Sequence, residues 1–92
     1  MMVMRQWRVR ELLKSVKNLA DLRTVISIVA EGGYDVWVSK FPDGVEVYSI
    51  ERGGRECFWV RVDRVAGRAE VFSRLGKFHE FSIAVKEVVP VG

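Results

Sequence analysis

The spacing of apolar side chains is helical in the first third of the chain. Over residues 8–17, apolar residues recur three and four positions apart, and a second stripe of the same period runs over residues 19–30. Asn18 fits the N-cap of the second stripe, and Gly32-Gly33 fits its C-terminal stop. The pattern therefore predicts helical structure over residues 8–31, either as two helices or as one kinked helix.

From Tyr34 onward, apolar and polar residues alternate, which is the period of strands. The alternation predicts five strands, over residues 34–41, 45–51, 56–64, 68–75 and 78–88. Turn residues separate them at Pro42-Asp43-Gly44, Gly53-Gly54, Ala66-Gly67 and Gly76-Lys77. Short turns between successive strands imply antiparallel pairing. We therefore predict an α+β fold, in which an N-terminal helix or helix pair packs on one face of a four- to five-stranded antiparallel meander sheet.

The lengths of the turns assign each strand residue to one of two faces. They place Ser39 opposite Val47, Tyr48 opposite Trp59, and Arg61 opposite Phe72. The face predicted to pack on the helices holds Trp37, Ser39, Phe41, Val45, Val47, Ser49, Phe58, Val60, Val62, Val71, Ser73 and Leu75. The opposite face is predicted to hold Val36, Val38, Lys40, Glu46, Tyr48, Ile50, Cys57, Trp59, Arg61, Phe72 and Arg74.

The register of the last strand stays open at this stage. In one register, Phe81, Ile83 and Val85 join the core face and Glu80 lies near Arg74. A slip by one residue places the same apolar side chains on the opposite face, because side chains alternate along a strand.

Length and composition exclude several classes of protein. A chain of 92 residues fits one domain, residues 1–92. The single cysteine and the single histidine exclude an internal disulfide and a Cys/His zinc cluster, and we expect neither metal nor cofactor. The sequence has no apolar run of about 20 residues and no signal-peptide pattern, so we expect a cytoplasmic protein without membrane contact. Scarce amides with abundant Val, Arg and Glu are typical of a hyperthermophile.

The net charge of +3 comes from 15 basic and 12 acidic residues, and the basic excess lies near the start. The first 17 residues hold five basic side chains against Glu11 alone. The five are Arg5, Arg8, Arg10, Lys14 and Lys17. A basic end of this kind favours an anionic partner.

Aromatic and basic side chains that share a sheet face are typical of single-stranded nucleic-acid binding. On the face predicted to be free of helices, Tyr48, Trp59 and Phe72 are the candidates for stacking on bases. Arg61, Arg74 and Lys40 are the candidates for phosphate contacts, and the five basic residues near the N-terminus would extend them. We therefore predict non-catalytic binding of single-stranded DNA, or of RNA, with low sequence specificity. Trp7 either anchors the helix to the sheet, which we favour, or stacks on a base. Arg52 and Arg55, at a hairpin tip, are either solvated turn residues, which is the commoner case, or phosphate contacts.

A protein interface is the alternative function for the same face. Trp, Tyr and Arg are the usual anchors of such interfaces, and small domains often gain stability by forming homo-oligomers.

An enzyme is not expected. Pro42-Asp43 and Glu51 resemble part of a metal-dependent nuclease motif, but Glu51 is followed by Arg52 and Gly53, so the Glu-x-Lys of that motif is missing. No glycine-rich phosphate loop is present either.

The chain as a whole resembles the archaeal ThermoDBP-related proteins. The resemblance lies in the basic helical start from Arg5 to Lys17, the Gly32-Gly33-Tyr34 entry into the sheet, and the aromatic and basic strands. Those strands contain Tyr34-Asp35-Val36-Trp37-Val38, Val45-Glu46-Val47-Tyr48 and Phe58-Trp59-Val60-Arg61. The resemblance implies single-stranded DNA binding without catalysis, and assembly of subunits around the strand. The chain has no separate C-terminal zipper, as in the shorter relatives.

Overall fold

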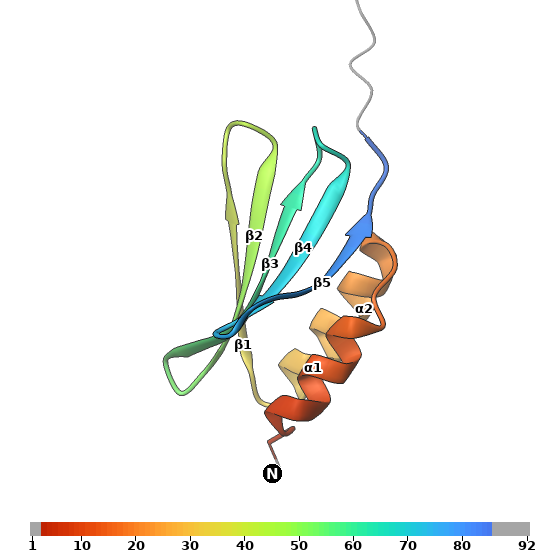
Figure 1. Cartoon of the computed structure of the whole chain (residues 1–92). Coiled ribbons are helices and arrows are strands. Elements are labelled where there is room, and N and C mark those ends of the chain that lie inside the picture. Colours follow the sequence, from red (N-terminus) through yellow and green to blue (C-terminus); the bar gives the residue numbers. More distant parts are fainter. Residues whose placement is uncertain (1–2, 86–92) are drawn as a thin grey trace, which may run out of the picture.

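The computed structural model describes residues 3–85, which form two helices followed by five strands (Figure 1). The helices are α1 (Gln6–Lys14) and α2 (Leu19–Glu31). The strands are β1 (Asp35–Lys40), β2 (Val45–Arg52), β3 (Arg55–Asp63), β4 (Arg68–Ser73) and β5 (Gly76–Ser82). They form one antiparallel sheet in the order β1-β2-β3-β4-β5, which confirms the predicted meander. Residues 86–88 of the last predicted strand lie outside the described residues.

Asn18 separates the two helices, so the alternative of one kinked helix is wrong. Its backbone is extended, with φ −157° and ψ 175°, and its side-chain oxygen accepts a hydrogen bond from the Asp21 N–H at 2.8 Å. The Asp21 carboxylate in turn accepts a hydrogen bond from the Lys17 N–H at 3.0 Å. The first bond satisfies a backbone donor that α2 itself leaves without a partner at its N-terminus, and the second ties the preceding loop to the first turn of α2.

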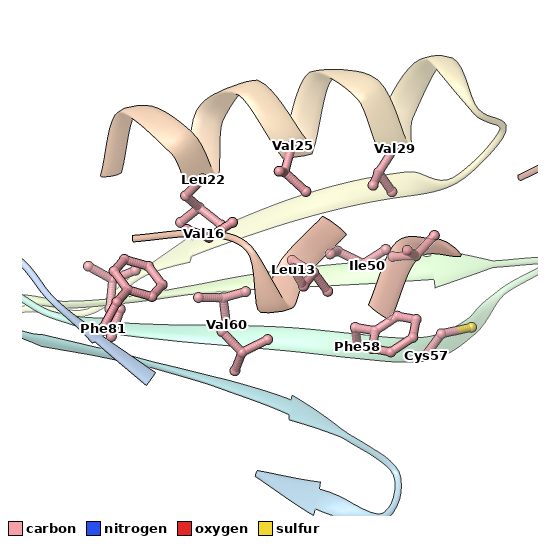
Figure 2. Close-up of a cluster of buried hydrophobic side chains, with 14 of the residues drawn as sticks. Leu13, Val16, Leu22, Val25, Val29, Ile50, Cys57, Phe58, Val60 and Phe81 are labelled. Carbon is pink, nitrogen blue, oxygen red and sulfur yellow. The ribbon is translucent and has the colours of Figure 1, made fainter. Parts of the chain in front are cut away.

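Both helices lie against the same face of the sheet, and the core lies between them (Figure 1). Figure 2 shows Leu22, Val25 and Val29 of α2 pointing toward the sheet, where Ile50 and Val60 lie. Burying each such side chain stabilises the fold by roughly 1.5–3 kcal/mol. Within residues 3–85 the other face of the sheet carries no helix, and we call it the outer surface.

The β2–β3 turn confirms the predicted two-residue hairpin, with Arg52 paired with Arg55. Gly53 and Gly54 have φ values of +59° and +78°, which residues with a Cβ rarely adopt. Two consecutive positive φ values define a type I′ turn, whose twist matches that of the flanking strands. The turn therefore fixes the two arginines side by side at the tip of the hairpin.

A bulge next to this turn makes the predicted faces of β1 and β2 wrong. Glu51 pairs with Glu56 but Ile50 pairs with Phe58, so Cys57 is an extra residue in β3, buried beside Phe58 (Figure 2). The register slips by one residue, and Tyr48 pairs with Val60 instead of Trp59.

The slip exchanges the two faces of β1 and β2. Residues predicted for the core lie on the outer surface: Trp37, Ser39, Val45, Val47 and Ser49. Residues predicted for the opposite face lie on the helix side: Val36, Val38, Lys40, Glu46, Tyr48, Ile50 and Cys57. Phe41 and Leu75, also predicted for the core, are 50% and 93% exposed in turns.

The β3–β4 turn is two residues longer than predicted. Asp63 pairs with Arg68, and the Asp63 carboxylate accepts hydrogen bonds from the N–H groups of Val65 and Ala66, at 3.1 and 2.9 Å. A register shift of two residues leaves each residue of β3 and β4 on its predicted face but changes which residues pair across the two strands. Trp59 lies opposite Phe72 and not Arg74, and Arg61 lies opposite Glu70 and not Phe72.

The last strand takes the register that places its apolar side chains in the core. Phe81 and Ile83 are buried, whereas Val85 is 55% exposed. The turn before it is Arg74-Leu75 and not the predicted Gly76-Lys77, because Ser73 pairs with Gly76. Glu80 therefore lies opposite Glu70 and away from Arg74.

Candidate nucleic-acid interface

One row of side chains crosses all five strands of the outer surface. The row consists of Trp37, Ser49, Trp59, Phe72 and Lys77. The rings of Trp59 and Phe72 are stacked, with centroids 5.4 Å apart and planes 7° apart. Trp37 is 62% exposed. The outer surface therefore brings together two of the aromatic residues predicted for stacking, and adds Trp37, which had been predicted for the core.

The cations of the outer surface are held by carboxylates. Arg61 lies 3.7 Å from both Asp63 and Glu70, and Lys77 lies 3.3 Å from Glu70 and 3.6 Å from Glu80. The strand positions of this surface hold the acids Asp35, Glu51, Glu56, Asp63, Glu70 and Glu80, and the bases Arg61, Arg68 and Lys77. Because acids outnumber bases, the outer surface repels a phosphate backbone.

Tyr48 and Lys40 lie on the helix side of the sheet and cannot act together with Trp59. Tyr48 is half-buried against the core, and burial, reinforced by the nearby Glu46 carboxylate, raises the pKa of its phenol. Lys40 is exposed at the end of β1, opposite Glu46. The predicted group of six site residues is thus divided between the two faces and the β4–β5 turn.

The basic residues near the N-terminus are divided between the two ends of α1. Arg5 is the N-cap of α1, Arg8 belongs to the first turn, and Arg10 follows on the half-buried side. Lys14 ends the helix, and Lys17 lies in the loop that leads to α2; both are exposed. Only the arginines lie near a concave surface.

Three adjoining hollows surround the first turn of α1. The first, of about 290 Å³, is lined by Gln6, Arg52, Gly53, Arg55, Cys57 and Arg74. The second is lined by Gln6, Trp7, Arg10, Cys57, Phe58, Ser73, Arg74 and Leu75. The third is lined by Val3, Met4, Arg5, Trp7, Arg8 and Gly32. We call the three together the arginine groove.

Contacts with the fold position two arginines of the groove. The guanidinium carbon of Arg10 lies 4.5 Å from the centroid of the Phe78 ring. Arg74 donates a hydrogen bond from Nε to the carbonyl oxygen of Glu56 at 3.2 Å. A second bulge lies in β5. Val71 of β4 pairs with His79 and Phe72 pairs with Lys77, so Phe78 is the extra residue. That bulge lets both Phe78 and His79 contact the helix side.

The arginines of the groove have no acidic partners among residues 3–85. Every ion pair in that part of the chain involves Arg61, Arg64 or Lys77. The first turn of α1 also lacks an acidic residue, so the positive end of the helix adds to the same potential. Among residues 3–85, the unpaired arginines of the groove are Arg5, Arg8, Arg10, Arg52, Arg55 and Arg74. Arg23 and Arg68 are in no ion pair either, but they lie outside the groove.

Trp7 lies at the junction of the second and third hollows. It is 62% exposed, so it is not the buried anchor that the sequence favoured. Its exposed ring stands among arginines, an arrangement that suits stacking on a base between phosphate contacts. The sequence singles out Trp7, Arg52 and Arg55 only one by one, because their meeting depends on how α1 packs beside the β2–β3 hairpin.

Other kinds of site receive no support from the described residues. Within 3–85, no group of three or more His, Cys, Asp or Glu side chains is placed to hold a metal ion. No helix in this part of the chain is long and apolar enough to cross a membrane. Comparisons of the chain with protein-family models, with curated proteins and with solved structures find no match. The resemblance to the ThermoDBP-related proteins therefore stays a prediction.

Proposed function

We propose that the protein binds single-stranded nucleic acid, without catalysis, through the arginine groove. The observation that carries the proposal is the set of six arginines without carboxylate partners around an exposed tryptophan. Unpaired guanidinium groups bind phosphates strongly, because they are weakly hydrated and can donate two parallel hydrogen bonds. The proposed function is the one expected from the sequence. The proposed stacking residue, however, is Trp7 in the arginine groove and not Trp59 on the outer surface.

Trp7 stacks on one base in this proposal. The arginines of the neighbouring hollows contact the phosphates on either side of that base: Arg5 and Arg8 on one side, Arg10 and Arg74 on the other. A base shows its face to a side chain only when it is unstacked, so single strands are preferred to duplexes. Stacking and phosphate contacts carry little sequence information, so binding tolerates many sequences.

The chain contains a matched pair of tryptophans that tests this assignment. Trp7 and Trp37 are each 62% exposed, the first in the arginine groove and the second on the outer surface. We expect Trp7→Ala to weaken binding of a fluorescent single-stranded DNA oligonucleotide by roughly 5- to 150-fold, since stacking contributes about 1–3 kcal/mol per base. Trp37→Ala should leave the affinity unchanged. Circular dichroism of both variants checks that each is folded.

Three outcomes of the titration contradict the proposal. Absence of binding by the unchanged protein at low salt rejects nucleic acid as the partner. A loss caused by Trp37→Ala or Trp59→Ala, with Trp7→Ala unaffected, places the strand on the outer surface. Equal affinity for a duplex of the same sequence excludes stacking on an unpaired base. An RNA oligonucleotide of the same sequence then decides between DNA, which we favour, and RNA.

Assembly of two copies through the outer surface is the second candidate function. The exposed Trp37 stands in one row with the stacked Trp59 and Phe72, and the cations in and beside that row are already paired with acids. Light scattering on a sizing column tests it: a dimer that Trp37→Asp converts to a monomer supports this assembly, and a monomeric unchanged protein rejects it.

A further inference from the structure

We propose that the first hollow of the arginine groove binds the terminal phosphate of the strand, a phosphomonoester. Arg52, Arg55 and Arg74 line this hollow together with Gln6 and Cys57. The inference rests on the proposed function, because the same strand would pass Trp7 before it reaches this hollow.

The first hollow lies at one end of the groove. The third hollow shares Trp7 with the second, and the second shares Gln6, Cys57 and Arg74 with the first. Beyond Arg74, the first hollow is bounded by the β2–β3 turn at Gly53. A strand that follows the groove from Trp7 therefore meets the hairpin, and a strand end fits there better than a continuing backbone.

The charge of the first hollow matches a terminal phosphate better than an internal one. An internal phosphodiester carries one negative charge, whereas a phosphomonoester carries about −1.5 to −2 near pH 7 and presents three strong acceptor oxygens. Three arginines line the hollow, and none is in an ion pair with a carboxylate of residues 3–85. Three guanidinium groups can saturate all three oxygens.

The nearest acids in sequence do not neutralise this charge. Glu51 and Glu56 adjoin Arg52 and Arg55 in the hairpin, but the register pairs them with each other, one position away from the arginine pair. Side chains of successive strand residues point to opposite faces, so the two glutamates belong to the outer surface. The carbonyl oxygen of Glu56 instead holds Arg74 in place, at 3.2 Å from its Nε.

Three oligonucleotides of one sequence test the inference, with a 5′-phosphate, a 3′-phosphate, or hydroxyl groups at both ends. We expect one of the two phosphorylated strands to bind about ten-fold more tightly than the hydroxyl-ended strand, because charge-assisted hydrogen bonds are strong. Which phosphorylated strand gains affinity identifies the end that is bound. Inorganic phosphate at millimolar concentration should reduce that gain and leave the hydroxyl-ended strand bound.

Variants connect the gain to the first hollow. Arg55→Gln and Arg74→Gln should each remove most of the preference for the phosphorylated end. Arg8→Gln, in the third hollow, should weaken all three strands equally, and Arg68→Gln, on the outer surface, should change none of them. Arg55 and Arg74 are exposed beside turns, so neither substitution removes a buried contact.

The outcomes separate this inference from the proposed function. If the hydroxyl-ended strand binds, depends on Trp7, and matches the affinity of both phosphorylated strands, the terminal-phosphate inference is wrong and the proposed function stands. A preference that survives in both Arg55→Gln and Arg74→Gln also overturns the inference. If no strand binds, both proposals fail together.

Discussion

The guanidinium group of Arg10 lies over the ring of Phe78, with 4.5 Å between the guanidinium carbon and the ring centroid. Phe78 in turn meets Phe58 edge-on, at 6.1 Å between centroids, and Phe58 is buried in the core. A cation held over an aromatic face gains about 0.5–1 kcal/mol at an exposed site. The core therefore holds one arginine of the groove in place before any ligand arrives.

Replacing Phe78 by leucine should weaken nucleic-acid binding by about two- to five-fold, which is the cation–π contribution expressed as affinity. The aliphatic side chain fills most of the volume, so the free energy of unfolding should fall by less than about 1.5 kcal/mol. Oligonucleotide titration and urea denaturation measure the two effects. Phe72→Leu, on the outer surface, is the control, and an equal loss of binding in both variants would contradict a specific role of the Arg10–Phe78 contact.

The dependence of binding on salt counts the phosphate contacts. For single strands, the logarithm of the binding constant falls with the logarithm of salt concentration with a slope of about −0.7 per neutralised phosphate. If each of the six arginines of the groove neutralises one phosphate, the slope is about −4, and Arg74→Gln should reduce its magnitude by about 0.7. Lys40→Gln should leave the slope unchanged, because Lys40 lies at the end of β1 and outside the groove. If Lys40→Gln reduced the slope and Arg74→Gln left it unchanged, the nucleic-acid strand would lie near β1.

The helices and the order of the strands could be predicted because short-range signals determine them. Asn18 caps α2, and the consecutive glycines after Arg52 form the type I′ turn that joins β2 and β3. The faces of β1 and β2 could not be predicted from turn lengths, because a single extra residue, Cys57, reverses the face of every residue beyond it. The adjacent apolar residues Cys57 and Phe58, which interrupt the alternation of β3, are the one local sign of this bulge.

The candidate site was harder to predict than the fold. Trp59 and Phe72 do share a surface, but the carboxylates around them belong to three different strands and become neighbours only through the register. Trp7 and Arg55 are nearly fifty positions apart, and the packing of α1 against the sheet brings them to one groove. Composition shows that arginine is abundant, whereas only the structure shows which arginines lack acidic neighbours.

Asn18→Ala should lower the free energy of unfolding by about 1 kcal/mol, because the cap bond to the Asp21 N–H at 2.8 Å is lost. For a domain of this size, that loss corresponds to a fall in Tm of about 4–8 °C. Asn18→Asp keeps an acceptor at the cap and should retain most of the stability. Thermal unfolding followed by circular dichroism measures both variants, and an unchanged Tm for Asn18→Ala would show that the cap does not stabilise α2.

Tyr34 makes stability sensitive to alkaline pH. Its hydroxyl donates a hydrogen bond to the carbonyl oxygen of Met4 at 2.9 Å, and burial raises the pKa of the phenol above its ordinary value of 10.0, against the opposing effect of the nearby Arg52 guanidinium. The folded protein thus binds the phenolic proton more tightly than the unfolded chain does. The resulting stabilisation is fully present below pH 10 and is lost as the pH rises through the raised pKa.

Comparison with Tyr34→Phe isolates this contribution from those of the other ionisable groups. At neutral pH, the unchanged protein should be more stable than the variant by about 0.5–1.5 kcal/mol, the net contribution of one hydrogen bond. Above pH 10 the difference should shrink, because the unfolded chain releases the phenolic proton at a lower pH than the folded protein does. Urea denaturation across this pH range measures the difference, and a constant difference would show that Tyr34 titrates alike in the folded and unfolded chains.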